Sequence, residues 1–250
     1  MHSTNYIVGF VAVMTTIVAI VLTALFLGLK DKSDTNAAIF NKRAILSAVK
    51  SQLGGKDPQE LSDEEVLDIF SKQVKQVVLD MSGNEVAADE MKSRGYKGGL
   101  AEDIDMNKEK KKPEADRLLP LYIFDTGKNK VYILSVRGNG LWDEIWGNIA
   151  LDSDLNTVVG AAFDHKGETP GLGAEIKDNP SFPNMFKGKK IYDNSGKYVS
   201  ITAVKGGTTK EDIHEIDVIS GATVTSNGVS EMMKRGIKYY EPYFNKLQSK

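Results

Sequence analysis

A run of small and hydroxyl residues near the carboxyl end has side chains suited to holding a phosphate. It consists of Asp217-Val218-Ile219-Ser220-Gly221-Ala222-Thr223-Val224-Thr225-Ser226-Asn227-Gly228. The spacing predicts an amphipathic helix that begins near Thr225 or Ser226, because apolar residues recur at helical intervals beyond it, at Val229, Met232, Met233, Ile237 and Tyr240. Threonine, serine and asparagine are good N-cap residues, and the free N–H groups and dipole of a helix N-terminus attract phosphate.

The chemistry of this run leaves two interpretations open. One is a strand-to-helix turn with an ordinary cap. The other is a ligand site, in which Gly221 and Ala222 let a bulky group approach the backbone closely. No base lies near Thr223 in the sequence, and a threonine hydroxyl is a weak nucleophile without one.

The pattern D-x-x-S-G-A-T resembles the flavinylation motif of the covalent FMN-binding domain family. In that family the last threonine carries FMN through a phosphoester. The resemblance implies that Thr223 is the acceptor and that Asp217, Ser220, Gly221 and Ala222 complete the motif. Thr225 lies beyond the motif and is kept as a binding residue only. The chain as a whole is similar to the C-subunit family of the bacterial Na+-translocating NADH:quinone oxidoreductases.

A second stretch has two glycines beside two tryptophans, at Arg137-Gly138-Asn139-Gly140-Leu141-Trp142-Asp143-Glu144-Ile145-Trp146-Gly147. A dinucleotide loop is discarded, because Asp143 replaces the third glycine of G-x-G-x-x-G and no βαβ pattern surrounds it. A tryptophan on such a loop can lie against a flat heteroaromatic ring. In the family a G-x-G-L-W stretch helps to build the flavin site, so Leu141 and Trp142 are predicted site residues, whereas Trp146 is predicted to be core.

A third stretch, residues 166–175, is too rich in glycine and proline for a regular element. A surface loop and a ligand-binding loop are both compatible with its composition. Its E-T-P-G-L-G sequence resembles the second signature of the same family, which forms the opposite wall of the flavin pocket. The resemblance adds these binding residues: Glu168, Thr169, Gly171, Leu172 and Gly173. His165 is expected to be a loop or strand-end side chain without a catalytic role.

Composition limits the alternatives. The chain has 250 residues, enough for one or two domains, and a formal net charge of −2, which gives no electrostatic basis for binding nucleic acid. It has no cysteine, so thiolate metal sites and Fe–S clusters are excluded. With three histidines, a multi-histidine zinc or haem site is not expected. No metal site and no catalytic residue is therefore predicted.

An apolar segment near the N-terminus predicts a membrane anchor. Ile7 to Leu29 contains no charge and no proline, and as a helix it would span ~35 Å. A cleaved signal peptide is disfavoured, because no lysine or arginine precedes the segment and Gly28-Leu29-Lys30 is a poor cleavage site. The flanking charges lean slightly toward a cytoplasmic carboxyl-terminal region. The family places its flavin domain outside the cytoplasm, and we follow the family in predicting a periplasmic domain on the bacterial inner membrane.

The remaining patterns predict an α+β fold, with one transmembrane helix followed by antiparallel hairpin strands and flanking helices. Predicted helices cover residues 36–53, a short segment from Ser62 and a final helix to about Leu247; Ser62 with Glu65 has capping-box spacing. Hairpins are expected at 74–88, 118–136 and 148–165, and further strands at 198–205 and 215–219. Residues 91–116, with the basic run 108–113, and residues 180–186 are expected to be polar connections. We expect an anchor at 1–34, a helical stalk region at 35–115 and the FMN-binding domain at 116–250.

The resemblance implies a flavin electron relay rather than a complete catalyst. Its cofactor would be covalent FMN, and its partners would be the other subunits of a membrane respiratory complex and a separate flavin transferase that takes FMN from FAD. The flavoprotein of the Rnf-type electron transport complex has the same motif and anchor and is the alternative. An anchored binding module without redox activity, using the 138–142 and 167–173 loops, is the hypothesis from another class. The single span has no ionisable side chain to mark an ion path.

Overall fold

A computed structural model of the chain describes residues 3–209 and 211–249. Its first element is α1 (Thr4–Ser47), and the chain forms two compact units, Met1–Asn41 and Lys42–Lys250. The expected separate helix at 36–53 is wrong, because α1 continues unbroken through that region to Ser47. No glycine or proline lies between Leu29 and Ser47 to end it. The 3-10 turn η1 (Lys50–Gln52) follows, and Gly54 and Gly55 then adopt positive φ.

Among the described residues, α1 is the one helix long and apolar enough to cross a membrane. The predicted span lies inside it. Its large apolar side chains are exposed along the whole predicted span, from Ile7 to Leu29.

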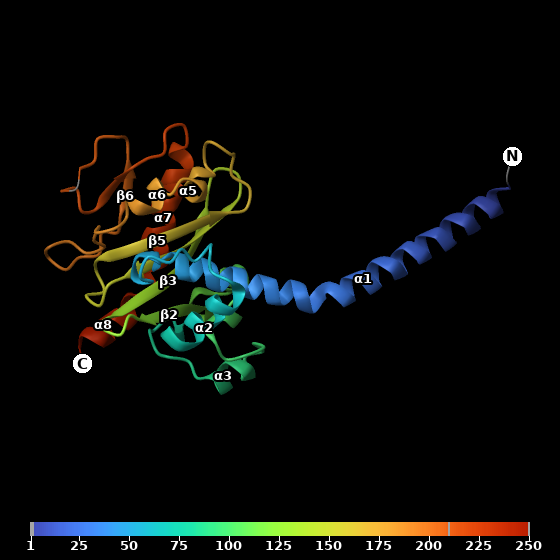
Figure 1. The fold of residues 1–250 in the computed structure, drawn as a ribbon, viewed down its shortest axis with the longest axis horizontal. Coiled ribbons are helices and arrows are strands. Elements are labelled where there is room, and N and C mark those ends of the chain that lie inside the picture. The colour runs from blue at the N-terminus through green and yellow to red at the C-terminus, as the bar shows by residue number, and fades with distance from the viewer. Residues whose placement is uncertain (1–2, 210, 250) are drawn as a thin grey trace. The chain divides into compact units, whose positions relative to one another are not determined.

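The second unit is built on an antiparallel meander (Figure 1). Its strands are β1 (Val74–Asp80), β2 (Leu118–Asp125), β3 (Lys130–Asn139), β4 (Glu144–Leu151) and β5 (Val158–His165), hydrogen-bonded in sequence order. The predicted α+β class and the hairpins β2–β3 and β4–β5 are confirmed. The predicted hairpin at 74–88 is reduced to one bridge between Leu79 and Glu85, because α3 begins at Ala88 and ends the returning segment.

A carboxyl-terminal helix, α7 (Thr223–Lys238), packs against β3 and supplies much of the core. The predicted apolar face is confirmed, since these residues are all buried: Val229, Met232, Met233, Ile237 and Tyr240. The approach is close, because a Cβ on Gly138 would lie 2.7 Å from Met232 Cβ. A single final helix is wrong. The helix ends before Tyr240, and α8 (Glu241–Gln248) starts afresh with Pro242 in its first turn.

A small parallel sheet delivers the chain to α7. It pairs β6 (Thr202–Val204) with β7 (Glu215–Asp217). Both strands are shorter than the segments predicted at 198–205 and 215–219, and their parallel pairing was not predicted. The strand β7 ends at Asp217, five residues before Ala222, the N-cap of α7.

The helix α2 (Asp63–Gln73) has the predicted capping box between Ser62 and Glu65. By contrast, residues 91–116 are more ordered than predicted. They contain the end of α3 (Ala88–Ser93) and then η2 (Ala101–Asp103), α4 (Met106–Glu109) and η3 (Glu114–Asp116).

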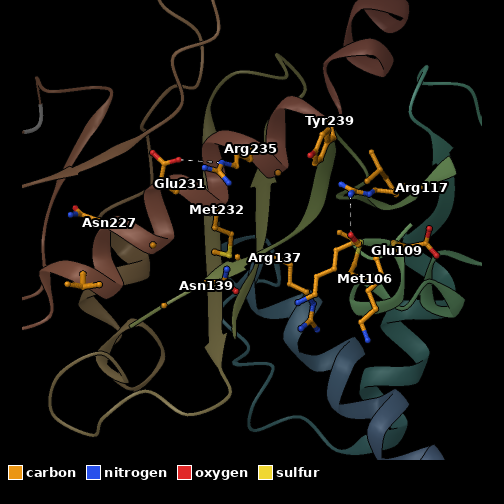
Figure 2. Close-up of a pocket in the computed structure, with 18 residues that line it drawn as sticks. Met106, Glu109, Arg117, Arg137, Asn139, Asn227, Glu231, Met232, Arg235 and Tyr239 are labelled. Carbon is orange, nitrogen blue, oxygen red and sulfur yellow. Dashed lines mark hydrogen bonds and ion pairs between the residues drawn. The ribbon is translucent and has the colours of Figure 1, made fainter. Parts of the chain in front are cut away.

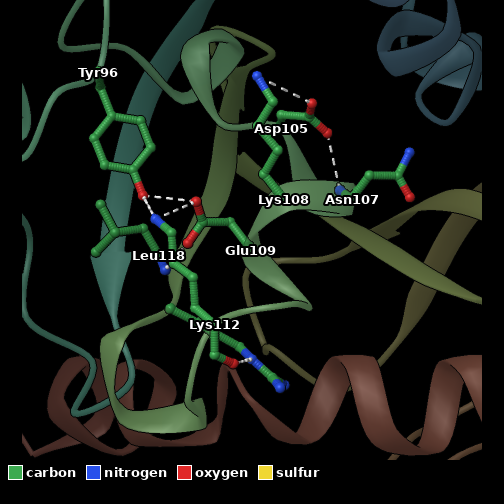
Figure 3. Close-up of polar contacts among 8 residues, drawn as sticks. Tyr96, Asp105, Asn107, Lys108, Glu109, Lys112 and Leu118 are labelled. Carbon is green, nitrogen blue, oxygen red and sulfur yellow. Dashed lines mark hydrogen bonds and ion pairs between the residues drawn. The ribbon is translucent and has the colours of Figure 1, made fainter.

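One buried carboxylate explains why residues 91–116 are ordered (Figure 3). Glu109 is 2% exposed and accepts hydrogen bonds from the Tyr96 hydroxyl at 2.6 Å, Lys112 Nζ at 2.8 Å and the Leu118 N–H at 2.9 Å. This contact fixes a segment whose sequence pattern is merely polar.

The prediction that residues 180–186 form a polar connection is also wrong. They include α6 (Ser181–Asn184), which follows α5 (Glu175–Asp178). Phe182 and Phe186 are buried against Phe163 of β5, with ring centroids 5.7 and 5.0 Å from it. The segment therefore contributes to the core at the β5 edge of the sheet.

Candidate functional site

Three of the predicted stretches meet at the carboxylate of Glu168. This side chain is 5% exposed and comes from the loop after β5. Its Oε1 accepts the backbone N–H of Trp142 at 3.0 Å, and its Oε2 accepts the Thr225 hydroxyl at 2.7 Å. One carboxylate thus joins the β3–β4 turn, the 166–174 loop and the first turn of α7.

Two glycines leave the space that this carboxylate occupies. A Cβ on Gly140 would overlap Glu168 Oε1, and a Cβ on Gly173 would overlap Glu168 Oε2 and lie 2.7 Å from Thr225 Oγ1. These glycines are required by packing around Glu168 and not by positive φ. Gly171 and Gly221 differ, because their φ values of +74° and +78° disfavour any side chain.

The surroundings of Glu168 favour its charged form. Burial by itself would raise the pKa of the carboxyl group. Hydrogen bonds from the Thr225 hydroxyl and from the backbone N–H groups of Trp142, Asp143 and Leu141 outweigh burial and lower the pKa below its usual value. The loop is therefore held by an ionised carboxylate at neutral pH.

Thr223, which ends the motif, and Thr225, two residues beyond it, have different environments. The helix α7 begins at Thr223, so the predicted start at Thr225 or Ser226 is late by two or three residues. Thr225 is 1% exposed and its hydroxyl is bound to Glu168, whereas Thr223 is half-buried. Two residues are about 200° apart around a helix, which accounts for the difference. Across residues 3–209 and 211–249, no group hydrogen-bonds the Thr223 hydroxyl.

The error in the helix start has a local cause. The Ser226 hydroxyl is buried, donates to the Ala222 carbonyl at 3.0 Å and accepts the Ile219 N–H at 3.0 Å. It therefore ties the preceding turn to the helix from a position inside the first turn. The N–H groups of Thr223, Val224 and Thr225 precede the first intrahelical hydrogen bond and have no partner within residues 3–209 and 211–249, so they can face an anion.

Apolar side chains surround this helix start on all three segments. Trp142 is 69% exposed, and its ring N–H donates to the Thr169 hydroxyl at 3.1 Å. Leu172 packs so close to Gly221 that a Cβ there would lie 2.8 Å from Leu172 Cδ2. The exposed apolar residues on these segments are Leu141, Trp142, Leu172 and Val224. Such a group is suited to covering a flat apolar ring.

Other predicted residues lie beside the site. The Asp217 carboxylate accepts the Thr208 N–H at 2.9 Å, and this hydrogen bond lowers the pKa of Asp217. Its side chain therefore holds the 205–209 loop. Ser220 is exposed, and Ala222 is buried as the N-cap of α7. His165 ends β5, as predicted, and its Nδ1 accepts the Glu168 N–H at 3.2 Å.

Sequence reasoning misjudged Trp146 and missed Arg137. Trp146 is half-buried rather than core, and the Arg137 guanidinium lies 4.9 Å from its ring centroid. It also missed Val224, which is 54% exposed. That position falls outside the helical apolar stripe that starts at Val229, which was the available signal for its exposure.

Comparison with known proteins gives this geometry a context. The model of the FMN-binding domain family matches residues 140–238, a range that contains every predicted site residue. The C-subunit of the Na(+)-translocating NADH-quinone reductase of Vibrio parahaemolyticus is 31% identical over 233 residues, covering 88% of this chain and 85% of the relative. This chain belongs to that C-subunit family. Of the two complexes that the sequence left open, this family belongs to the Na+-translocating NADH-quinone reductase and not to the Rnf-type complex.

Further members support the assignment. The C-subunit of the same reductase from Neisseria meningitidis is 34% identical over 199 residues, covering 75% of each chain. The crystal structure of the C-subunit from Parabacteroides distasonis has a TM-score of 0.72 at 32% identity and covers 86% of this chain and 96% of that one. The Shewanella oneidensis NqrC structure has a TM-score of 0.67 at 28% identity and covers 84% of this chain and 99% of that one.

Proposed function

We propose that this chain is the electron-transfer flavoprotein subunit of a Na+-translocating NADH-quinone reductase and carries FMN covalently on Thr223. The observation that supports this proposal most directly is the state of the Thr223 hydroxyl. It lies at the start of α7, within the range matched by the FMN-binding domain family, and has no hydrogen-bond partner among the described residues. Thr225 is the poorer acceptor, because its hydroxyl is buried and bound to Glu168.

The helix start fits a phosphoester at that oxygen. The N–H groups of residues 223–225 and the positive end of the α7 dipole would stabilise the negative charge of the phosphate. Attachment through the phosphate leaves the flavin ring unmodified. It also retains the cofactor through repeated reduction and oxidation, which suits a carrier.

The exposed apolar side chains define where the ring would lie. Leu141 and Trp142 from the β3–β4 turn, with Leu172 from the 166–174 loop, would contact its faces. The Thr169 hydroxyl already accepts the Trp142 ring N–H and can still donate its own hydrogen to a ring or ribityl oxygen. Glu168 is a support for these walls, because its carboxylate is engaged by protein donors.

FMN exchanges one or two electrons, and the protein contributes binding, burial and hydrogen bonds. The β3–β4 turn lacks the third glycine of a dinucleotide loop, so NADH oxidation is assigned to another subunit. The chain would therefore relay electrons between partners that hold the other cofactors.

Maturation and location complete the proposal. A separate flavin transferase would load Thr223 and would recognise the motif partly through Asp217 and the exposed Ser220. The exposed apolar side chains of α1 would anchor the chain in the bacterial inner membrane, with the flavin domain in the periplasm.

In-gel fluorescence tests the attachment. The full chain, expressed with its flavin transferase and denatured, is expected to give a flavin-fluorescent band. Thr223→Val is expected to lose the band and Thr225→Val to keep it. Loss with Thr225→Val alone would show that the cofactor is on the other threonine, and a dark wild-type band would refute the proposal.

A further inference from the structure

A groove of about 700 Å³ runs beside α7 (Figure 2). Residues of α7 from Val224 to Gly236, with Tyr239 just after its end, form one wall, and residues 106–117 form the other. The end of β3, with Arg137 and Asn139, lies between them. All of these residues belong to the 42–250 unit. None of the predicted flavin residues lines this groove.

The lining carries an excess of positive charge. Its basic residues are Lys110, Lys111, Arg117, Arg137 and Arg235, against the acidic residues Glu109 and Glu231. Glu109 adds no net negative charge to the groove, because it is buried and its charge is matched by Lys112, which is outside the lining.

Several of the cations lack a carboxylate of their own. The Arg117 guanidinium donates to the carbonyls of Lys112 at 3.1 Å and Lys110 at 3.2 Å, and in the described part of the chain it meets no carboxylate. Lys110 and Arg137 share the one carboxylate of Glu144. Arg235 lies 3.5 Å from Glu231 in an exposed pair, which is a weak contact.

The floor between these charges is apolar. Leu119 and Met232 are buried beneath it, and the absence of side chains on Gly138 and Gly236 brings α7 close to β3. At one end the groove reaches Val224, the residue that follows the proposed flavin carrier.

We propose that this groove docks an extended acidic segment of the neighbouring redox subunit. The proposal rests on the function proposed above. Positive groups on three separate elements match several carboxylates spaced along a polypeptide better than one lipid headgroup. A segment seated there would end beside Val224 and so place its own subunit next to Thr223, which favours short-range electron transfer.

Photocrosslinking in the intact membrane complex tests the occupant. The photoreactive residue p-benzoylphenylalanine replaces Glu231, which is exposed and lines the groove, or, as the matched control, Lys234, which is exposed on α7 outside it. The expected result is a crosslink from position 231 to an acidic segment of another subunit of the complex, identified by peptide mass spectrometry, with none to that segment from 234. A crosslink to lipid, to a segment without net negative charge, or equally from both positions would overturn the proposal.

Charge reversal tests the electrostatic basis. In Lys111→Glu/Arg235→Glu, the crosslink yield and NADH-driven quinone reduction are expected to fall about tenfold at low ionic strength. The control Lys234→Glu/Lys238→Glu makes the same change on exposed residues outside the lining and is expected to leave both unchanged. Equal effects in the two double variants would contradict the groove as the docking site.

The bound flavin separates this inference from the function proposed above. Intact mass is measured on every variant. If all variants carry FMN and the groove variants behave as the control does, the docking proposal fails and the proposed function stands. If the wild-type chain carries no FMN, the proposed function fails, whatever the crosslinks show.

Discussion

The Thr225 hydroxyl donates a 2.7 Å hydrogen bond to the buried carboxylate of Glu168. The same carboxylate accepts the Trp142 N–H at 3.0 Å. The start of α7 is thereby fixed against both loops that flank it. Thr225 is used for this contact, whereas Thr223, two residues earlier on a different face of the helix, is left with an accessible hydroxyl.

Replacing Glu168 should reduce stability in a pH-dependent way. Its pKa is lower in the folded chain than in the unfolded chain, where a glutamate titrates near ~4.3. Its stabilisation is therefore complete above the unfolded pKa and is lost as pH falls through the folded pKa. We expect Glu168→Gln to cost about 1–3 kcal/mol at neutral pH, and this difference from wild type to shrink on acidification below about pH 4.

Thermal or denaturant unfolding at a series of pH values measures this difference. Glu60→Gln, at an exposed glutamate, is the control and should follow the wild type throughout. A difference for Glu168→Gln that grows as pH falls would show that the carboxylate is not held in its charged form.

Gly167 and Gly173, two of the three glycines of the 166–174 loop, should respond differently to a methyl group. In Gly173→Ala the new Cβ would overlap Glu168 Oε2, and we expect a loss of about 1–3 kcal/mol in unfolding free energy. In Gly167→Ala the nearest atom would be 3.9 Å away, so the change should be small. Chemical denaturation of both variants distinguishes them, and equal stabilities would contradict the packing around Glu168.

Variants of the residues that contact the buried Glu109 should differ in stability. Removing its charge partner in Lys112→Met leaves a carboxylate that is 2% exposed without a counter-ion, which should cost about 3–5 kcal/mol. Tyr96→Phe removes one hydrogen bond and should cost about 1 kcal/mol. Lys108→Met breaks only a loose, exposed pair with Asp105 and should be near neutral. Melting temperatures give the order, and a Lys112→Met variant as stable as Lys108→Met would show that Glu109 does not depend on its partner.

Local patterns predicted the elements whose residues determine them directly. The capping box at Ser62, the β2–β3 and β4–β5 hairpins and the buried face of α7 follow from spacing and from turn residues. The elements that were missed depend on contacts distant in sequence. Phe182 is held by Phe163, and Glu109 orders the 91–116 segment, and neither contact has a periodic signal.

The site shows the same division. The motifs located the segments that meet at the start of α7, and the resemblance supplied their interpretation. The carboxylate bridge of Glu168 could not be predicted, because it requires the relative placement of three loops. The assignment of each predicted residue to flavin binding and the domain boundary after residue 115 stay predictions; β1 pairs with β2 across that boundary.

Covalent attachment of FMN to Thr223 is tested most directly by the mass of the peptide that contains this residue, from the chain purified out of its native membrane. We expect a gain of one FMN less one water on that peptide, with fragment ions placing the addition on the Thr223 oxygen. An unmodified peptide, or an addition placed on Thr225, would contradict it.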